Sequence, residues 1–256
     1  MELFKVQNIG FSQNGKTIVD DVSVNIDKGT VTGFLGKSGC GKTTLIKLIS
    51  GIYVPTHGKS LYNGHNVQTL SKSRNLDFRK KCSFVFQDSA LWANQDIMQN
   101  MILPLKIHYP KMPLEDMKIC VNEALEKVNF KKPLFLRPAD LSAGEQKKVA
   151  FARAIITEPE MLFLDEVTAA LDVSGVDLIM DILQSFVSEG KTIIYVSHNS
   201  EFIKSFHGKL HIIEDGRLKN TLSGFVDIDN LMDEFDREEN EEDEENDDDE
   251  IIGENL

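Results

Sequence analysis

One short stretch, GKSGCGKTT at positions 36–44, constrains this chain more than any other part of its sequence. It matches the spacing G-x-x-x-x-G-K-[ST] of a phosphate-binding loop. Glycine lacks a Cβ, so backbone N–H groups can close around an anion. Lys42 can then reach the outer phosphates, and the Thr43 hydroxyl can join a Mg²⁺ shell. The predicted phosphate-binding residues are Gly36, Lys37, Ser38, Gly39, Cys40, Gly41, Lys42, Thr43 and Thr44.

The segments on either side of this loop support the match. Residues 30–36 are apolar and β-branched, which predicts a buried strand. Residues 42–51 place apolar side chains at helical spacing and end on a glycine, which predicts a helix with a C-cap. Because the loop would join a strand to a helix, the phosphates would lie at the positive end of the helix dipole.

An acidic pair, Asp165 and Glu166, ends a second apolar run, MLFLDE at 161–166. Open parallel sheets bind ligands at the carboxyl ends of their strands. Asp165 is therefore a candidate Mg²⁺ ligand, directly or through water, and Glu166 is a candidate general base for an attacking water. Without the phosphate-binding loop, two acids after a strand would indicate only a solvated strand end.

The formal net charge of −13 at pH 7 is unevenly distributed. Residues 227–256 contain 17 acids and one base, so the remainder carries +3. Low hydrophobicity and dense like charge predict that this tail is disordered. A solubilising extension and a docking arm for a basic partner both stay open as its role. Nucleic acid is not expected as a partner, because phosphates would repel the tail.

Other features indicate a chain in a reducing compartment. No apolar run approaches the roughly 18–20 residues of a membrane span, and the N-terminus has no signal-peptide pattern. Cys40, Cys82 and Cys120 are far apart and odd in number, which argues against a disulfide framework or a cysteine metal site. We therefore expect the protein to be located in the cytosol.

Three further sequence motifs follow the phosphate-binding loop along the chain. Gln87 ends the predicted strand SFVFQ, LSAGEQ at 141–146 opens a predicted helix, and His198 ends the predicted strand TIIYVSH. Together with AALD at 169–172, the set resembles the ATP-binding cassette family, the nucleotide-binding subunits of ABC transporters. The resemblance covers residues 1–226, and the motifs occur in the family's order, so they are specific as a set.

The resemblance and the alternation of strand and helix patterns predict an α/β fold. This would be a P-loop NTPase (RecA-like) core with a mainly parallel sheet, an N-terminal antiparallel β region and an inserted helical subdomain. The expected boundaries are 1–87 and 159–226 for the core, 88–158 for the helical subdomain and 227–256 for the acidic tail. Individual elements are expected at 58–64, 82–87, 113–130, 142–158, 161–166, 174–189, 191–198 and, as a hairpin, 211–218.

The resemblance also implies roles for residues. Two chains would close head to tail over two ATP molecules, each held by one chain's P-loop and the other chain's signature helix. The expected signature contacts are Leu141, Ser142, Ala143, Gly144 and Glu145. The expected contacts to a chain's own ATP are Phe11 stacking on adenine, His198 at the γ-phosphate, Glu166 as base, Asp172 in the D-loop, and Thr43, Asp165 and Gln87 around Mg²⁺.

The chain departs from the family pattern at four positions. Ala143 replaces the usual signature glycine, Glu145 replaces the usual glutamine, and Val167 stands where proline is common. Cys40 is unusual in a P-loop; a small filler is the favoured interpretation, and a reactive thiolate at the helix N-terminus is the alternative.

The resemblance also implies a membrane partner. In the family, a groove after the Q-loop receives a short helix of the permease, and Leu91, Trp92, Met98 and Met101 are candidates to line it, with the helical core as the alternative for the methionines. The run at 84–105 looks like the ATPases of Mce/Mla-type lipid transport, which implies an Mce-domain partner at the cytoplasmic face of the inner membrane. Other importers, lipoprotein-release systems and a non-transport cassette of iron–sulfur assembly stay open.

Overall fold

The computed structural model describes residues 1–206, 208–224, 226–235 and 237. Its strands are β1 (Glu2–Gln13), β2 (Lys16–Asp27), β3 (Val31–Leu35), β4 (His57–Tyr62), β5 (His65–Asn66), β6 (Cys82–Val85), β7 (Met161–Asp165), β8 (Thr192–Val196), β9 (Lys209–Glu214) and β10 (Arg217–Leu222). Its helices are α1 (Lys42–Ile49), α2 (Lys72–Lys81), α3 (Ile97–His108), α4 (Leu114–Lys127), α5 (Ala143–Ile155), α6 (Val173–Ser188) and α7 (Ser200–Ser205), with 3₁₀ turns at Val67–Thr69 and Pro138–Asp140.

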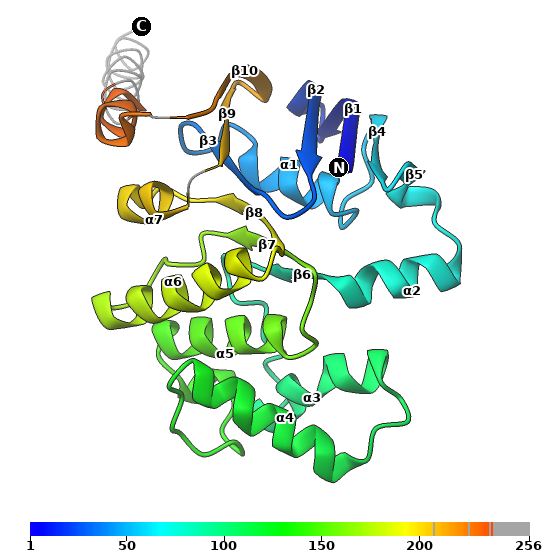
Figure 1. Ribbon diagram of the computed structural model, residues 1–256, viewed down its shortest axis with the longest axis vertical. Coiled ribbons are helices and arrows are strands. Elements are labelled where there is room, and N and C mark those ends of the chain that lie inside the picture. Colours follow the sequence, from blue (N-terminus) through cyan, green and yellow to red (C-terminus); the bar gives the residue numbers. More distant parts are fainter. Residues whose placement is uncertain (207, 225, 236, 238–256) are drawn as a thin grey trace, which may run out of the picture.

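The strands form two sheets, as the sequence predicts (Figure 1). The larger sheet has the order β10-β9-β3-β8-β7-β6, and its neighbours pair in parallel except at the β9–β10 hairpin. The smaller sheet has the order β2-β1-β4-β5 and is antiparallel. The α/β fold with a mainly parallel sheet and an N-terminal antiparallel region is therefore confirmed.

The central strands are apolar throughout because both faces of the parallel sheet are covered. In β3, β7 and β8 every residue is buried. Side chains alternate between the two faces of β7: Leu162 and Leu164 pack with α5 and α6, whereas Phe163 packs with α1 and the antiparallel sheet. The sheet thus separates two apolar cores.

Helices α3, α4 and α5 lie together below the sheet in Figure 1 and share one of these cores with it.

Helix α4 buries one face. Met117, Val121 and Leu125 line this face, as their three- and four-residue spacing predicts. Leu114 continues the same spacing and is expected on that face, but as the first residue of α4 it is 51% exposed. The domain boundaries stay a prediction.

Some elements differ from expectation. β6 ends at Val85 and β8 at Val196, so Gln87 and His198 each lie two residues beyond a strand rather than at its end. Helices α2 and α7 were not predicted; α2 buries a single side chain, Phe78, so it has no apolar periodicity to detect. Residues 228–235 form a helix, as their amphipathic pattern predicts, and the acidic segment 238–256 lies outside the described residues.

A buried histidine in β9 predicts how stability depends on pH. Burial lowers the pKa of His211 from 6.5 to about 4, and its Nδ1 lies 2.8 Å from Thr221 Oγ1. Because the unfolded chain takes up a proton on His211 near pH 6.5 and the folded chain does not, this histidine alone should lower the free energy of unfolding by about 2 kcal/mol between pH 7.5 and pH 5. Glu166, whose pKa burial raises to about 7, acts in the opposite direction over this interval. In urea unfolding, the wild type should therefore lose about 2 kcal/mol relative to His211→Gln between these pH values, and no such difference is expected between the wild type and His65→Gln, a variant of an exposed histidine.

Candidate active site

The glycine-rich loop joins β3 to α1, as the motif requires. Gly36, Gly39 and Gly41 all have positive φ (144°, 72° and 99°), the region that other residues rarely adopt. Two of them also have no space for a side chain. A Cβ on Gly36 would lie 2.1 Å from Ile213 O, and one on Gly41 would lie 2.5 Å from Ile18 O. The loop is therefore locked between β2 and β9 with its N–H groups exposed around the start of α1.

Lys42 is folded back into this loop. It is 5% exposed, and its Nζ donates to Gly36 O at 2.7 Å and to Lys37 O at 2.5 Å. The ammonium thus lies at the centre of the ring of backbone groups, at the N-terminus of α1. This placement suits the binding of an anion between Lys42 and the loop amides.

The pair Thr43 and Asp165 joins the loop to β7. Thr43 Oγ1 donates to Asp165 Oδ1 at 2.6 Å, and the other oxygen, Oδ2, is buried without a hydrogen-bond partner among the described residues. Burial raises the pKa of Asp165, against the opposing effect of Thr43. A hydroxyl and an under-coordinated carboxylate oxygen, next to a phosphate site, fit Mg²⁺, which takes few protein ligands plus phosphate oxygens and water.

No cluster of three or more His, Cys, Asp or Glu side chains suited to a metal occurs among the described residues. The predicted Mg²⁺ set would instead use the Thr43 hydroxyl, the Asp165 carboxylate and Gln87.

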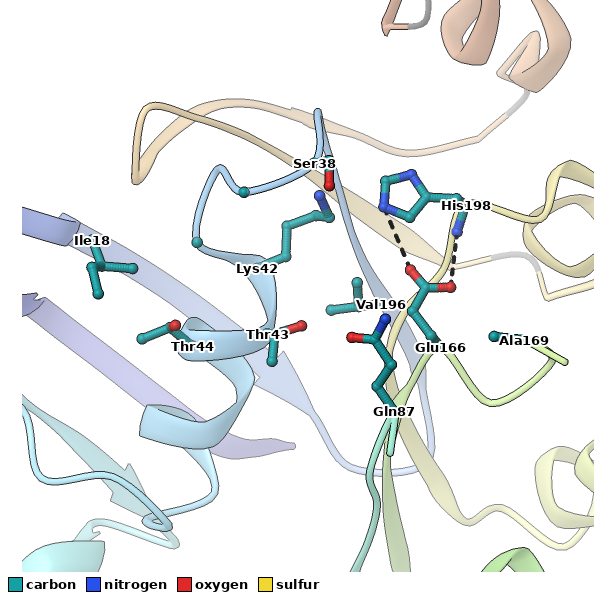
Figure 2. Close-up of a pocket in the computed structure, with 12 residues that line it drawn as sticks. Ile18, Ser38, Lys42, Thr43, Thr44, Gln87, Glu166, Ala169, Val196 and His198 are labelled. Carbon is teal, nitrogen blue, oxygen red and sulfur yellow. Dashed lines mark hydrogen bonds and ion pairs between the residues drawn. The ribbon is translucent and has the colours of Figure 1, made fainter. Parts of the chain in front are cut away.

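Glu166 follows β7 in a left-handed conformation, with φ of 49°. Its carboxylate faces His198: the backbone N–H of His198 donates to Oε2 at 3.4 Å, and His198 Nε2 lies 3.5 Å from Oε1 (Figure 2). Burial raises the pKa of Glu166 to about 7, while the His198 N–H opposes the shift. A carboxylate with a pKa near neutrality is matched to general-base chemistry.

Lys42, Thr43, Gln87, Glu166 and His198 line one cavity of about 420 Å³. Figure 2 shows Lys42 and Thr43 from the loop, Gln87 from the segment after β6, and Glu166 and His198 from the ends of β7 and β8 around one space. Ser38, Gly39, Gly41 and Thr44 also line it. The sequence did not indicate Ile18 and Val196 as lining residues, and Ala169 lines the cavity as the first residue of the AALD motif.

Other predicted residues lie outside this cavity. Phe11 is half-buried, and its ring stacks on Tyr53 with centroids 5.5 Å apart and planes at 20°. Adenine stacking on Phe11 stays a prediction. Asp172 caps α6 by accepting from Gly175 N at 2.9 Å.

The signature residues lie at the start of α5 and are not among the residues that line the cavity. Ser142 is the N-cap as expected: its Oγ accepts from Glu145 N at 3.2 Å, and Glu145 Oε2 accepts from Ser142 N at 2.9 Å. Lys132 Nζ adds an ion pair to Glu145 at 2.8 Å. The unusual Glu145 thus completes a capping box and holds the loop of Lys132. Leu141 is buried, whereas Ser142 and the extra methyl of Ala143 are exposed.

Gly144 is the signature position where size matters. A Cβ there would lie 2.9 Å from Ala170 O, in the segment that leads to α6. We expect Gly144→Val to destabilise the fold by about 1–3 kcal/mol, since the backbone of one segment must move. Ala143→Val should change stability by less than about 0.5 kcal/mol, because position 143 is exposed. Equal unfolding midpoints in urea for the two variants would contradict this packing.

The structure distinguishes between two pairs of alternatives. Burial raises the pKa of Cys40, although Lys42 Nζ lies 3.6 Å from its Sγ, so the favoured small-filler interpretation is supported over the thiolate alternative. Met101 is fully buried, which supports the helical core over the partner groove for this methionine. Trp92 is 55% exposed, and Leu91 and Met98 are half-buried.

Comparison with known proteins decides the family. The family model described as "ABC transporter" matches residues 19–169, more than half of the chain. The chain belongs to this family. The E. coli intermembrane phospholipid transport ATP-binding protein MlaF is 32% identical over 84% of this chain and 80% of its own length. The methionine import ATP-binding protein MetN of Haemophilus ducreyi is 33% identical over 86% of this chain, which spans 64% of that relative.

Solved structures of ABC cassettes share the fold. The ATP-binding cassette MJ0796, in a dimeric post-hydrolysis state with ADP and Pi, superposes with a TM-score of 0.80 and 26% identity. The alignment covers 87% of this chain and all of that one. The protein is thus an ATP-binding subunit of the ABC ATPase class, with the P-loop NTPase fold that the sequence predicts.

Proposed function

We propose that this ABC cassette hydrolyses ATP with Mg²⁺ in the cavity between the P-loop and Glu166. The observation that carries the proposal is the convergence of Lys42, Thr43, Glu166 and His198 on one cavity, with Asp165 hydrogen-bonded to the Thr43 hydroxyl. Lys42 and the loop amides would bind the β- and γ-phosphates. Mg²⁺, held by Thr43 and Asp165 with Gln87 nearby, supplies charge neutralisation at the phosphates.

The chain's own residues would then activate water. Glu166 would accept a proton from a water whose oxygen attacks the γ-phosphorus, while the bond from that phosphorus to the bridging oxygen breaks and ADP leaves with the bonding electrons. His198 would orient the carboxylate through the two contacts described above. Because the pKa of Glu166 is about 7, a large fraction is ionised at pH 8 and little at pH 6. ATP turnover should therefore rise over this interval.

The signature helix supports a second element of the proposal, a homodimer. Ser142 and Gly144 do not line their own chain's cavity, and Ser142 is exposed at the start of α5, where a phosphate held by another molecule could reach it. We propose that a second copy supplies that phosphate, in a two-fold arrangement with two ATP molecules between the chains. ATP would favour this closed state because it gains contacts only there.

We further propose that the subunit powers lipid transport together with a membrane permease. Two observations support this choice: the resemblance of residues 84–105 to Mce/Mla-type ATPases and the similarity to MlaF. Within that run, buried Asn100 organises the loop that presents Trp92, accepting from Trp92 N at 2.8 Å and donating to Trp92 O at 3.2 Å. The exposed Trp92 would contact the permease at the cytoplasmic face of the inner membrane.

The similarity to MetN favours a second candidate, an importer of a small solute such as methionine. Every helix of the described residues is too short or too polar to traverse a bilayer. Affinity purification of the tagged chain from its native membranes distinguishes the two. A permease with an Mce-domain protein supports lipid transport, and a permease with a solute-binding protein for an amino acid overturns it.

A further inference from the structure

Helix α5 contacts more than the signature. Its side chain Lys147 lies five residues after Ser142 and reaches the loop that follows β6. Lys147 Nζ donates to Gln87 O at 2.6 Å and to Phe86 O at 3.2 Å. The helix that carries the signature therefore holds the backbone of the residue whose side chain enters the ATP cavity.

A second cation of α5 extends the contact along the same loop. Arg153 donates to Ala90 O at 2.9 Å and to Ser89 O at 3.0 Å. Ser89 and Ala90 both have positive φ (64° and 45°), which is unfavourable for residues with a Cβ. Two side chains of one helix thus bind four of the five carbonyls in the segment 86–90, which we call the Q-loop.

Lys147 is almost completely buried, with 2% of its surface exposed, which is unusual for a lysine that binds two backbone carbonyls. Burial of an ammonium is unfavourable unless hydrogen bonds and nearby opposite charge compensate. Burial lowers the pKa of Lys147, and Asp165, Asp88 and Glu166 act in the opposite direction. None of these carboxylates forms an ion pair with Lys147 within 4.0 Å among the described contacts. The hydrogen bonds of the ammonium therefore go to the two Q-loop carbonyls, while Asp165 and Glu166 stabilise its charge from a greater distance.

We propose that Lys147 is a positioning residue for ATP hydrolysis, which fixes Gln87 and joins it mechanically to the Ser142 end of α5. This inference rests on the proposed function. Ser142 would contact the partner copy's ATP, whereas Gln87 serves the chain's own site. When Ser142 contacts the ATP of the partner copy, any movement of α5 is passed through Lys147 to Gln87, which lines the ATP cavity of its own chain.

The test separates turnover from ATP affinity. Lys147→Met keeps the length of the side chain and removes its donors and charge, while the P-loop stays intact. We expect kcat to fall at least tenfold and the Kd for ATP to change less than threefold. Lys147→Arg, which keeps donors and charge, should recover part of kcat. Lys131→Met, an exposed lysine ahead of α5, is the control and should match the wild type.

The experiment distinguishes an error about the role of Lys147 from an error about the ATPase function itself. If the wild type and Lys131→Met hydrolyse ATP and Lys147→Met retains full kcat, the positioning role is wrong and the ATPase site stands. If the wild type bound to its permease hydrolyses no ATP, both are wrong. Should Lys147→Met not fold, Lys147→Gln replaces it, since a glutamine amide is too short to reach both carbonyls; wild-type kcat in that variant would overturn the inference.

Discussion

Glu166→Gln is expected to lower the rate of ATP hydrolysis by roughly 10²- to 10⁴-fold while ATP still binds. The glutamine keeps the size of the side chain and cannot accept a proton from water. The P-loop, Lys42 and the Thr43–Asp165 pair are unchanged, so the phosphate and Mg²⁺ contacts persist. Steady-state release of phosphate gives the turnover, and equilibrium binding of a fluorescent ATP analogue gives the affinity.

The control for this prediction is another carboxylate at the surface. Glu201→Gln changes an exposed acid in the first turn of α7 and should leave both turnover and binding as in the wild type. Retention of more than a tenth of wild-type turnover in Glu166→Gln would show that a different group activates water. Loss of ATP binding in that variant would show that Glu166 serves the nucleotide site itself.

The second large effect is expected at the P-loop lysine. Lys42→Ala should weaken ATP binding by about 10- to 100-fold, because hydrogen bonds to charged groups contribute about 1.5–3 kcal/mol. Turnover should fall further, by roughly 10²- to 10³-fold, since Lys42 also stabilises charge that develops on the transferred phosphoryl group. Titration calorimetry with Mg-ATP, together with the phosphate assay, measures both quantities.

Removal of Lys42 also removes one hydrogen bond from Gly36 O and one from Lys37 O, which still accepts from Cys40 N at 3.4 Å, so the fold must be checked in parallel. Circular dichroism melting of Lys42→Ala answers this point, and Lys131→Met serves again as the matched control. A well-folded Lys42→Ala protein with wild-type ATP affinity would exclude the P-loop as the phosphate site.

The nucleotide site could be predicted from the sequence because its groups lie in short motifs at strand ends. The order strand, glycine loop and helix fixes where Lys42 and Thr43 must point. A parallel sheet brings the end of β7 beside that loop, so Asp165 meets Thr43 across 122 positions of sequence. The left-handed φ of Glu166 was not predictable, since it depends on the Val196 carbonyl that accepts from its N–H at 3.1 Å.

Other features depended on contacts that the sequence does not encode locally. Met101 could line a groove or a core by its spacing alone, and only the packing of α3 against α4 and α5 places it inside. The sequence favoured a small filler at Cys40 and left a reactive thiol open, and only the fold shows that burial outweighs the nearby ammonium in its effect on the pKa of this thiol. Lys147 carried no motif signal, and only the fold of residues 86–90 against α5 shows what it binds.

The central claim is that ATP lies between the P-loop of one copy and the Ser142 helix of another. Light scattering of the Glu166→Gln chain, with and without Mg-ATP, tests it most directly. One chain has a mass of 28.8 kDa, and the account predicts that this mass doubles with Mg-ATP and does not double when Ser142→Arg is added. A mass that stays at one chain in Mg-ATP, or a nucleotide-induced dimer that is indifferent to Ser142→Arg, would contradict it.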